Sequence, residues 1–255
     1  MKKTIVALMT LAGVAFAEST ISPLTDATAG SWTHSNKNTI TDGVLFGDPN
    51  WQVDPSIYTL TSEITLGQDD VFSFSFDATN NGTGNGVLTL AFVGTQKAIV
   101  VGHGTYDKPA DEIQLGITDE LTAQGYVFAN TNPTDDVQLT ALTTLSGGMP
   151  KGGVTSTISG SIAWDGDSYA ITINSSAVES AVSYDLGITS FDVSQLVVTI
   201  EGGATPTASD DAWKTATMSN LTISVASTTP AVPEPATATL SLLALAGLAS
   251  RRRRK

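Results

Sequence analysis

Apolar and polar residues alternate one by one along most of the chain, from about residue 18 to residue 226. A period of two places successive side chains on opposite faces of a β-strand, and we find no stretch of helical length with a 3.6-residue period. Clusters rich in Gly, Asn and Thr punctuate the alternating runs at 80–86, 147–148, 152–153 and 202–203. The pattern therefore predicts an all-β, antiparallel sandwich of two sheets. The residues expected to face its core are Phe72, Phe74 and Phe76; Leu88, Leu90 and Phe92; Ile158, Ile162 and Trp164; Tyr169, Ile171 and Ile173; Leu196, Val198 and Ile200; and Leu221, Ile223 and Val225.

One segment of this pattern reads as a hairpin. Asp165-Gly166-Asp167 separates Trp164 from Tyr169, and Asp-Gly is a favoured pair for a tight turn. With the runs 71–77 and 86–93 and the closing run 218–225, the hairpin at 159–173 resembles the laminin-G/concanavalin A-like jelly roll. The resemblance implies a jelly-roll β-sandwich over residues 18–226, a size above the roughly 100 residues of an immunoglobulin domain. Any tight hairpin favours Asp-Gly, so other β-sandwiches remain alternatives.

The first 17 residues differ from this body. Lys2 and Lys3 precede an apolar run from residue 5 to 16, and Ala15-Phe16-Ala17 has the small-x-small pattern of a cleavage site. The run is shorter than the roughly 20 residues of a membrane-spanning helix. We therefore predict a secretory signal peptide over 1–17, with cleavage directed by Ala15 and Ala17, rather than an N-terminal membrane anchor.

The C-terminus has a matching organisation. A linker at 227–231 leads into Val232-Pro233-Glu234-Pro235, an apolar segment at 236–249 and the basic cluster 251–255. Fourteen residues rise about 21 Å as a helix, marginal for a hydrocarbon core of about 30 Å. The arginines would hold the far end of this helix on the cytoplasmic face. Without a family to compare, the segment indicates a C-terminal stop segment on an exported protein.

This tail resembles the PEP-CTERM sorting signal of Gram-negative bacteria, also described as an ice-binding protein C-terminal domain. The resemblance covers about residues 230–255, with the sorting signal itself at 232–255, and includes Pro233, Glu234 and Pro235 and the cluster Arg251, Arg252, Arg253 and Arg254. It implies recognition and processing by an exosortase, a membrane-embedded sorting protease, in a producer of exopolysaccharide. The expected course is export through the inner membrane, a transient or stable C-terminal membrane anchor, then the cell surface or extracellular matrix. A plain membrane anchor is the alternative.

Charge separates the two ends from the body. The formal net charge is −13, but seven of the twelve Lys and Arg residues lie in the terminal segments. Residues 18–235 contain five lysines, no arginine and all 25 acids, a formal charge of −20. Such a body repels nucleic acid and anionic lipid, so we exclude a nucleic-acid partner and expect membrane contact only through the C-terminal segment.

No catalytic residue is predicted. The chain has no cysteine and only two histidines, His34 and His103, which excludes thiol chemistry and a multi-histidine metal centre. The adjacent acids at 111–112 and 119–120 lack the alternate spacing that puts two carboxylates of a glycosidase on one strand face. A G-x-S-x-G elbow and a P-loop are also missing. We interpret His103 as a surface loop residue that follows the strand 99–101.

Two weaker features concern ligands. Calcium is the one metal we consider, because Asp oxygens on loops suit it, and Asp165 and Asp167 are the candidate ligands. The acid pairs 69–70, 135–136 and 210–211 are alternatives, and turn-forming Asp is the simpler interpretation of each. Trp32 and Trp51, in polar or Pro-flanked segments, are the candidates for an exposed platform on which a sugar stacks.

Three functions follow as hypotheses. The first is an exported, non-catalytic β-sandwich of the envelope or extracellular matrix that binds carbohydrate, with polysaccharide as its partner. The second is a diverged glycoside hydrolase or lyase on the same fold. The third is a purely structural adhesion or matrix protein without a ligand site.

Overall fold

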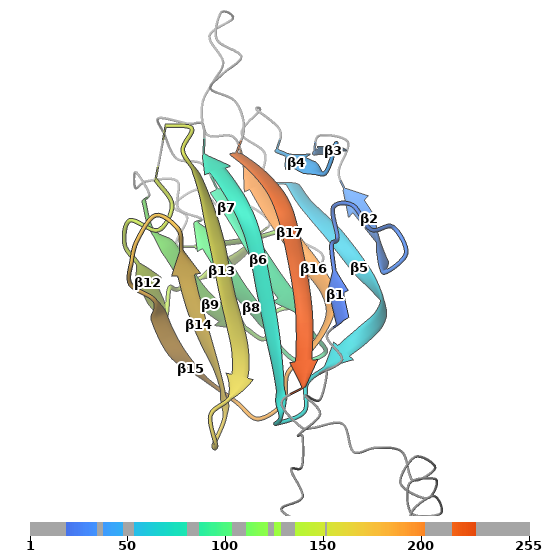
Figure 1. Ribbon diagram of the computed structural model, residues 1–255, viewed down its shortest axis with the longest axis vertical. Helices are drawn as coiled ribbons and strands as arrows, with labels where there is room; N and C mark the ends of the chain where they lie inside the picture. Colours follow the sequence, from blue (N-terminus) through green and yellow to red (C-terminus); the bar gives the residue numbers. More distant parts are fainter. Residues whose placement is uncertain are drawn as a thin grey trace, which may run out of the picture.

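A computed structural model of the chain describes residues 19–34, 38–47, 54–80, 87–103, 111–121, 125–128, 136–150, 152–201 and 216–227. These residues form two large sheets that lie face to face, and the described part contains no helix (Figure 1). The predicted antiparallel β-sandwich is thereby confirmed.

One sheet has eight strands in the order β15-β14-β13-β6-β17-β4-β3, and β1 also pairs with β17. Every pairing in it is antiparallel, including the predicted hairpin, in which Trp164 lies opposite Tyr169. Its strands are β1 (Ser19–Ile21), β3 (Thr39–Thr41), β4 (Val44–Phe46), β6 (Asp70–Asn80), β13 (Thr155–Trp164), β14 (Tyr169–Ser175), β15 (Val182–Ile188) and β17 (Ala216–Ser227).

The second sheet has seven strands in the order β12-β9-β8-β7-β16-β5-β2. A separate parallel pair, β10 with β11, completes the described strands. The bounds are β2 (Gly30–His34), β5 (Asp54–Thr65), β7 (Val87–Val93), β8 (Ala98–His103), β9 (Ile113–Thr118), β10 (Tyr126–Phe128), β11 (Val137–Leu139), β12 (Thr143–Leu145) and β16 (Asp192–Glu201).

The main core fills the space between the two sheets. Phe72 of β6 meets Phe92 of β7 edge to face, with ring centroids 5.1 Å apart. Phe74 and Phe191 pack against the same pair of rings. The alternation that predicted these inward positions is confirmed, except that Trp164 and Val225 are only half-buried at the margin of this core.

The middle of the seven-stranded sheet is buried on both faces. Every residue of β7 and of β8 is buried, because β10 and β11 cover the outer face with a second apolar cluster. Two buried threonines fix this cover: Thr89 donates to the Tyr126 carbonyl oxygen at 2.7 Å, and the Tyr126 N–H donates to Thr199 Oγ1 at 2.9 Å. Period-two alternation cannot predict such a strand, since both of its faces are apolar.

The interpretation of His103 as a surface loop residue is wrong. It is the last residue of β8, pairs with Leu88 of β7 and has a side chain that is only 2% exposed. The preceding Gly102 has a φ of 146°, a backbone conformation that glycine tolerates, so β8 continues through this position. Gly102 therefore lies within the strand and does not end it.

Strand β17 is irregular near its middle. It pairs with β6 from Ala216 to Ser227, but the register shifts between Ser219 and Thr222, as in a β-bulge. Asn220, at the bulge, has a φ of 52°. On the other side of β17, β4 pairs with residues 217–219 and β1 with residues 223–225. Residues 220–222 therefore face the gap between these two strands.

Several predicted segments lie outside the described residues. These are the signal peptide 1–17, most of the linker 227–231, the apolar helix 236–249 and the basic tail 251–255. No bilayer-spanning helix is found among the described residues. The described sandwich ends at Ser227, next to Asp70, which is its partner in the ladder with β6.

Candidate functional site

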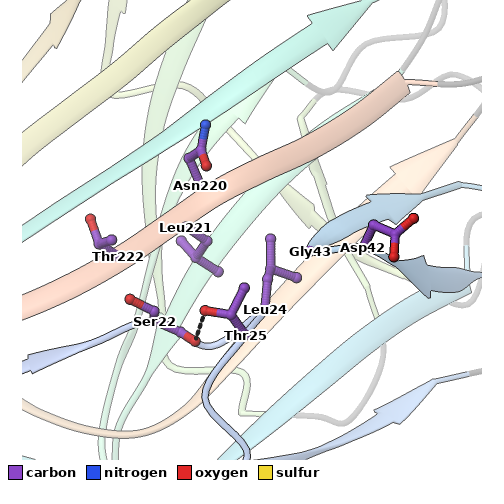
Figure 2. A pocket seen from close by; sticks show the side chains of 8 residues that line it. All are labelled: Ser22, Leu24, Thr25, Asp42, Gly43, Asn220, Leu221 and Thr222. Carbon is purple, nitrogen blue, oxygen red and sulfur yellow. Dashed lines mark hydrogen bonds between the residues drawn. The ribbon is translucent and has the colours of Figure 1, made fainter.

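A pocket of about 180 Å³ opens in the gap between β1 and β4. Three parts of the chain line it: the turn after β1, the hairpin between β3 and β4, and the bulge of β17 (Figure 2). They contribute, in that order, Ser22, Leu24 and Thr25; Asp42 and Gly43; and Asn220, Leu221 and Thr222.

The pocket combines an apolar floor with a polar rim. Leu24 and Leu221 are almost fully buried, at 9% and 1% exposure, and belong to the main core. Thr25, Asp42 and Asn220 are exposed, so the polar groups of the rim are open to solvent. The rim offers hydroxyl groups, one amide and one carboxylate.

A tight turn holds Asp42 at the rim. Thr41 and Val44 pair across the hairpin of β3 and β4, and the two residues between them have φ values of 49° and 77°. Positive φ at both central positions defines a type I′ turn, for which Asp-Gly is a preferred sequence. A Cβ at Gly43 would lie 3.1 Å from Thr25 Cγ2, so the hairpin tip lies against the turn after β1.

The turn after β1 is fixed by its own backbone. The Ser22 carbonyl oxygen accepts hydrogen bonds from the Thr25 and Asp26 N–H groups at 3.0 and 2.8 Å. The Asp26 carboxylate accepts from the backbone N–H and the hydroxyl of Thr28, at 2.8 and 2.6 Å. These bonds, the hydroxyl first, lower the pKa of Asp26. The residues that follow the pocket-lining turn therefore form a second hydrogen-bonded turn.

Two aromatic side chains anchor the same turn from below. The Trp32 indole N–H donates to the Pro23 carbonyl oxygen at 2.7 Å, and the Tyr58 hydroxyl donates to the Asp26 carbonyl oxygen at 3.2 Å. The two rings pack with centroids 5.2 Å apart. Burial, and then the charge of Asp26, raises the pKa of Tyr58. This wall of the pocket is therefore held in place without a ligand.

Asn220 is held in a similar way on β17. Its Nδ2 donates to Asp77 Oδ2 at 2.7 Å, and Asp77 Oδ1 accepts from the Thr157 hydroxyl at 2.6 Å. The amide of Asn220 thereby bridges the bulge to β6 and, through Asp77, to β13.

The candidate stacking residues differ in what the structure tells of them. Trp32 is half-buried, packs against the core and uses its N–H within the chain, so it supports the pocket wall instead of lying on an open face. Trp51 lies outside the described residues. Trp32 is not fully buried, and its direct contact with a sugar stays a prediction.

The candidate calcium ligands lie on the exposed turn between β13 and β14. Asp165 Oδ1 accepts hydrogen bonds from the N–H groups of Asp167 and Ser168, both at 3.2 Å, which is the usual role of Asp in a turn. Among the residues with described positions, no three His, Asp or Glu side chains come together as a metal-binding group. The described donors at this turn do not by themselves fit calcium, which prefers six to eight oxygens.

The lining residues were not found by sequence reasoning. Asp42-Gly43 carries a turn signal that could have located the hairpin, since Asp-Gly favours a type I′ turn. Ser22, Thr25 and Thr222 are ordinary hydroxyl residues in a chain rich in them. Only the pairing of β1 and β4 to the same side of β17 brings these residues together.

Comparison with known proteins identifies the tail and the fold. Residues 231–255 match the PEP-CTERM protein-sorting motif, which confirms the predicted sorting signal. The motif indicates export and C-terminal sorting in a Gram-negative bacterium and implies processing by an exosortase. No curated protein matches the sequence closely enough to count as a relative.

Two solved plant lectins share the fold. The winged bean acidic lectin, complexed with methyl-α-D-galactose, is 10% identical with a TM-score of 0.50, and the match covers 84% of this chain and 99% of the lectin. Peanut lectin, solved with a nine-residue peptide, is 8% identical with a TM-score of 0.51, covering 84% and 98%. These likenesses confirm the concanavalin A-like jelly roll.

Proposed function

We propose that this protein is an exported, exosortase-sorted carbohydrate-binding protein of the cell envelope or extracellular matrix, without catalytic activity. The observation that carries the proposal is the direct join between a lectin-type sandwich and a sorting motif. Strand β17 ends at Ser227, and the motif begins at residue 231. The sorting machinery therefore delivers the sandwich itself. The winged bean acidic lectin, which shares the fold, was solved in complex with methyl-α-D-galactose, and this supports a sugar as the ligand here.

The charge of the body favours an uncharged glycan as the partner. A formal charge of −20 over residues 18–235 opposes the approach of uronate-rich or sulfated polymers, as it opposes nucleic acid. Hydroxyl-rich neutral polysaccharide carries no such penalty. An exopolysaccharide of the producing cell, which the resemblance of the tail implies, is the natural source of such a polymer.

The pocket supports binding without turnover. Glycoside hydrolysis uses two carboxyl groups on opposite sides of the scissile bond, about 5–9.5 Å apart. The residues lining the pocket supply one carboxylate, Asp42. Among the described lining residues, a sugar held there would meet one carboxylate and no second acid to protonate a leaving group.

The positions of the chain ends suggest how the sandwich is oriented relative to the membrane. Strand β1 runs antiparallel to β17, with Ser19 opposite Val225, so the chain enters the sandwich near the point where it leaves for the tail. While the tail holds the protein at the membrane, this end faces the bilayer. The opposite end, with the β3–β4 hairpin, faces outward, where polysaccharide is met (Figure 1).

Affinity electrophoresis tests the binding. The full-length chain, purified in mild detergent because of its apolar tail, is run through gels containing neutral or uronate polysaccharides, with calcium or with EDTA. Retardation by at least one neutral polymer is expected, and the comparison of calcium with EDTA measures whether binding needs the ion. Unchanged mobility in every gel contradicts carbohydrate binding.

The sorting part is tested separately in the producing organism. Deletion of residues 230–255 should send the protein into the medium unprocessed, because the motif recognised by the exosortase is removed. Immunoblots of medium, envelope and matrix fractions measure the outcome. The same distribution for the deletion variant and the full-length chain would contradict exosortase sorting.

A further inference from the structure

We propose that the pocket at the β17 bulge is a carbohydrate site that holds one neutral hexopyranose ring of the bound polysaccharide. The inference rests on the proposed function and assigns it a place: the gap between β1 and β4, closed by the β3–β4 hairpin (Figure 2). Its size sets the occupant. A pocket of about 180 Å³ is smaller than the roughly 300–1,000 Å³ of sites for drug-sized ligands, so it takes a single ring and not a stretch of chain.

The lining chemistry matches a sugar ring. Each sugar hydroxyl is both a donor and an acceptor, and the hydroxyls of Ser22 and Thr222 have the same double capacity. The Thr25 hydroxyl donates to the Ser22 carbonyl oxygen at 3.4 Å, so its oxygen is left to accept (Figure 2). Asp42 accepts only, which suits a pair of neighbouring hydroxyls that both donate. Below them, Leu24 and Leu221 offer an apolar surface for the C–H face of the ring.

The same residues exclude other ligand classes. Among the residues that the structure describes, no Lys, Arg or His lines the pocket and the one charged group is the Asp42 carboxylate, which would repel a phosphate or a uronate. A single carboxylate is also too little for a divalent cation, which needs several oxygen ligands. An uncharged polyol can donate hydrogen bonds to the Asp42 carboxylate and exchange hydrogen bonds with the hydroxyls, and it brings no second negative charge into the pocket.

The pocket is formed before a ligand arrives. The Trp32 and Tyr58 anchors hold the turn after β1, the type I′ turn holds Asp42, and Asp77 holds Asn220. Preformed walls reduce the ordering cost of binding. Since Thr25, Asp42 and Asn220 are exposed at the rim, the polymer on either side of the bound ring can continue into solvent.

Two substitutions in full-length protein test the site. D42N removes the charge but keeps the turn, because Asn-Gly favours a type I′ turn as strongly as Asp-Gly does. T222V removes a hydroxyl at nearly constant shape on a strand that accepts β-branched residues. We expect each variant to lose about tenfold in affinity for the neutral polysaccharide that retards the wild type most, measured by affinity electrophoresis.

The matched control is E179Q. Glu179 is an exposed acid on the turn between β14 and β15, at the opposite edge of the eight-stranded sheet from the β3–β4 hairpin. E179Q changes the net charge as D42N does, and we expect its affinity for the polysaccharide to equal that of the wild type. Thermal unfolding of all three variants checks that the fold is intact, and T222V keeps the test decisive should D42N alter the hairpin.

The outcomes separate the site from the function. Wild-type binding that is unchanged in both D42N and T222V overturns the pocket and leaves the carbohydrate-binding function standing. Equal losses in D42N and E179Q also overturn the site, because they indicate a general effect of charge. A wild type that binds no polysaccharide overturns both. Competition by one member of a panel of methyl hexosides is expected, and a failure of every member at high concentration overturns the single-ring occupant.

Discussion

The bulge at Asn220 allows a quantitative test of how β17 is held. Asn220 has a φ of 52°, in the left-handed region that a Cβ disfavours by about 1–2 kcal/mol, although Asn adopts it more readily than most residues. Its side chain also donates to Asp77 Oδ2 at 2.7 Å, an exposed bond that contributes about 0.5–1 kcal/mol. N220A loses the hydrogen bond and meets the full backbone cost. N220G loses the same bond but relieves the backbone.

From these terms we expect N220A to destabilise the sandwich by about 2 kcal/mol and N220G by about 1 kcal/mol, after the greater freedom of glycine in the unfolded chain is included. For a domain of about 200 residues, a difference of about 1 kcal/mol separates the two melting temperatures by about 2–4 °C. Scanning calorimetry and urea unfolding measure both variants against the wild type.

A third variant checks the electrostatic side of the same contact. N220D keeps the shape and the tolerance of positive φ, but it places a carboxylate against Asp77. We expect it to be less stable than N220G at pH 7, because two carboxylates then face each other. A melting temperature of N220A equal to or above that of N220G would refute the argument from φ.

The remaining predictions concern the supports of the fold. W32F should lower the free energy of unfolding by about 1–2 kcal/mol in urea, because the partly buried Pro23 carbonyl oxygen loses its donor while the aromatic contact is kept. A loss below about 0.3 kcal/mol would contradict the role of this hydrogen bond. G102A should destabilise the protein by about 3 kcal/mol or more, because a Cβ there would collide with the Leu88 carbonyl oxygen and Gly102 has a φ of 146°. A soluble variant with wild-type stability would show that β8 adjusts. Burial raises the pKa of Tyr126 to about 12, so the stability that its neutral phenol contributes is complete below pH 10 and is lost as the pH rises from 10 to 12. Because burial also raises the pKa of Tyr58 and Tyr169, alkaline unfolding should show a loss in both proteins and a smaller one in Y126F; equal losses would contradict the role of Tyr126.

Sequence reasoning predicted the class of fold because alternation is a local property of the chain. The inward positions at Phe72, Phe74 and Phe76 follow from a period of two, and so does the hairpin at 165–167. The sorting motif was recognisable for a similar reason, since its three features lie in order within 231–255. Both kinds of signal need no knowledge of which strands become neighbours.

The error at His103 shows where local patterns fail. Strand β8 is buried on both faces because β10 and β11 lie over the seven-stranded sheet, and no alternation marks such a strand. Strand β17 is a related case. The bulge at Asn220 changes which parity points inward, so Met218 and Leu221 both face the core although three positions separate them.

The sequence by itself determined that this protein is an acidic all-β sandwich with a C-terminal sorting motif, because those properties are written in periodicity, charge and contiguous residues. Only the tertiary structure decided where a ligand could bind. The pocket exists because two short strands, β1 and β4, pair with the same side of β17 and leave residues 220–222 between them. Its polar groups come from positions near 22, 42 and 220, and nothing in a linear pattern brings such distant residues together.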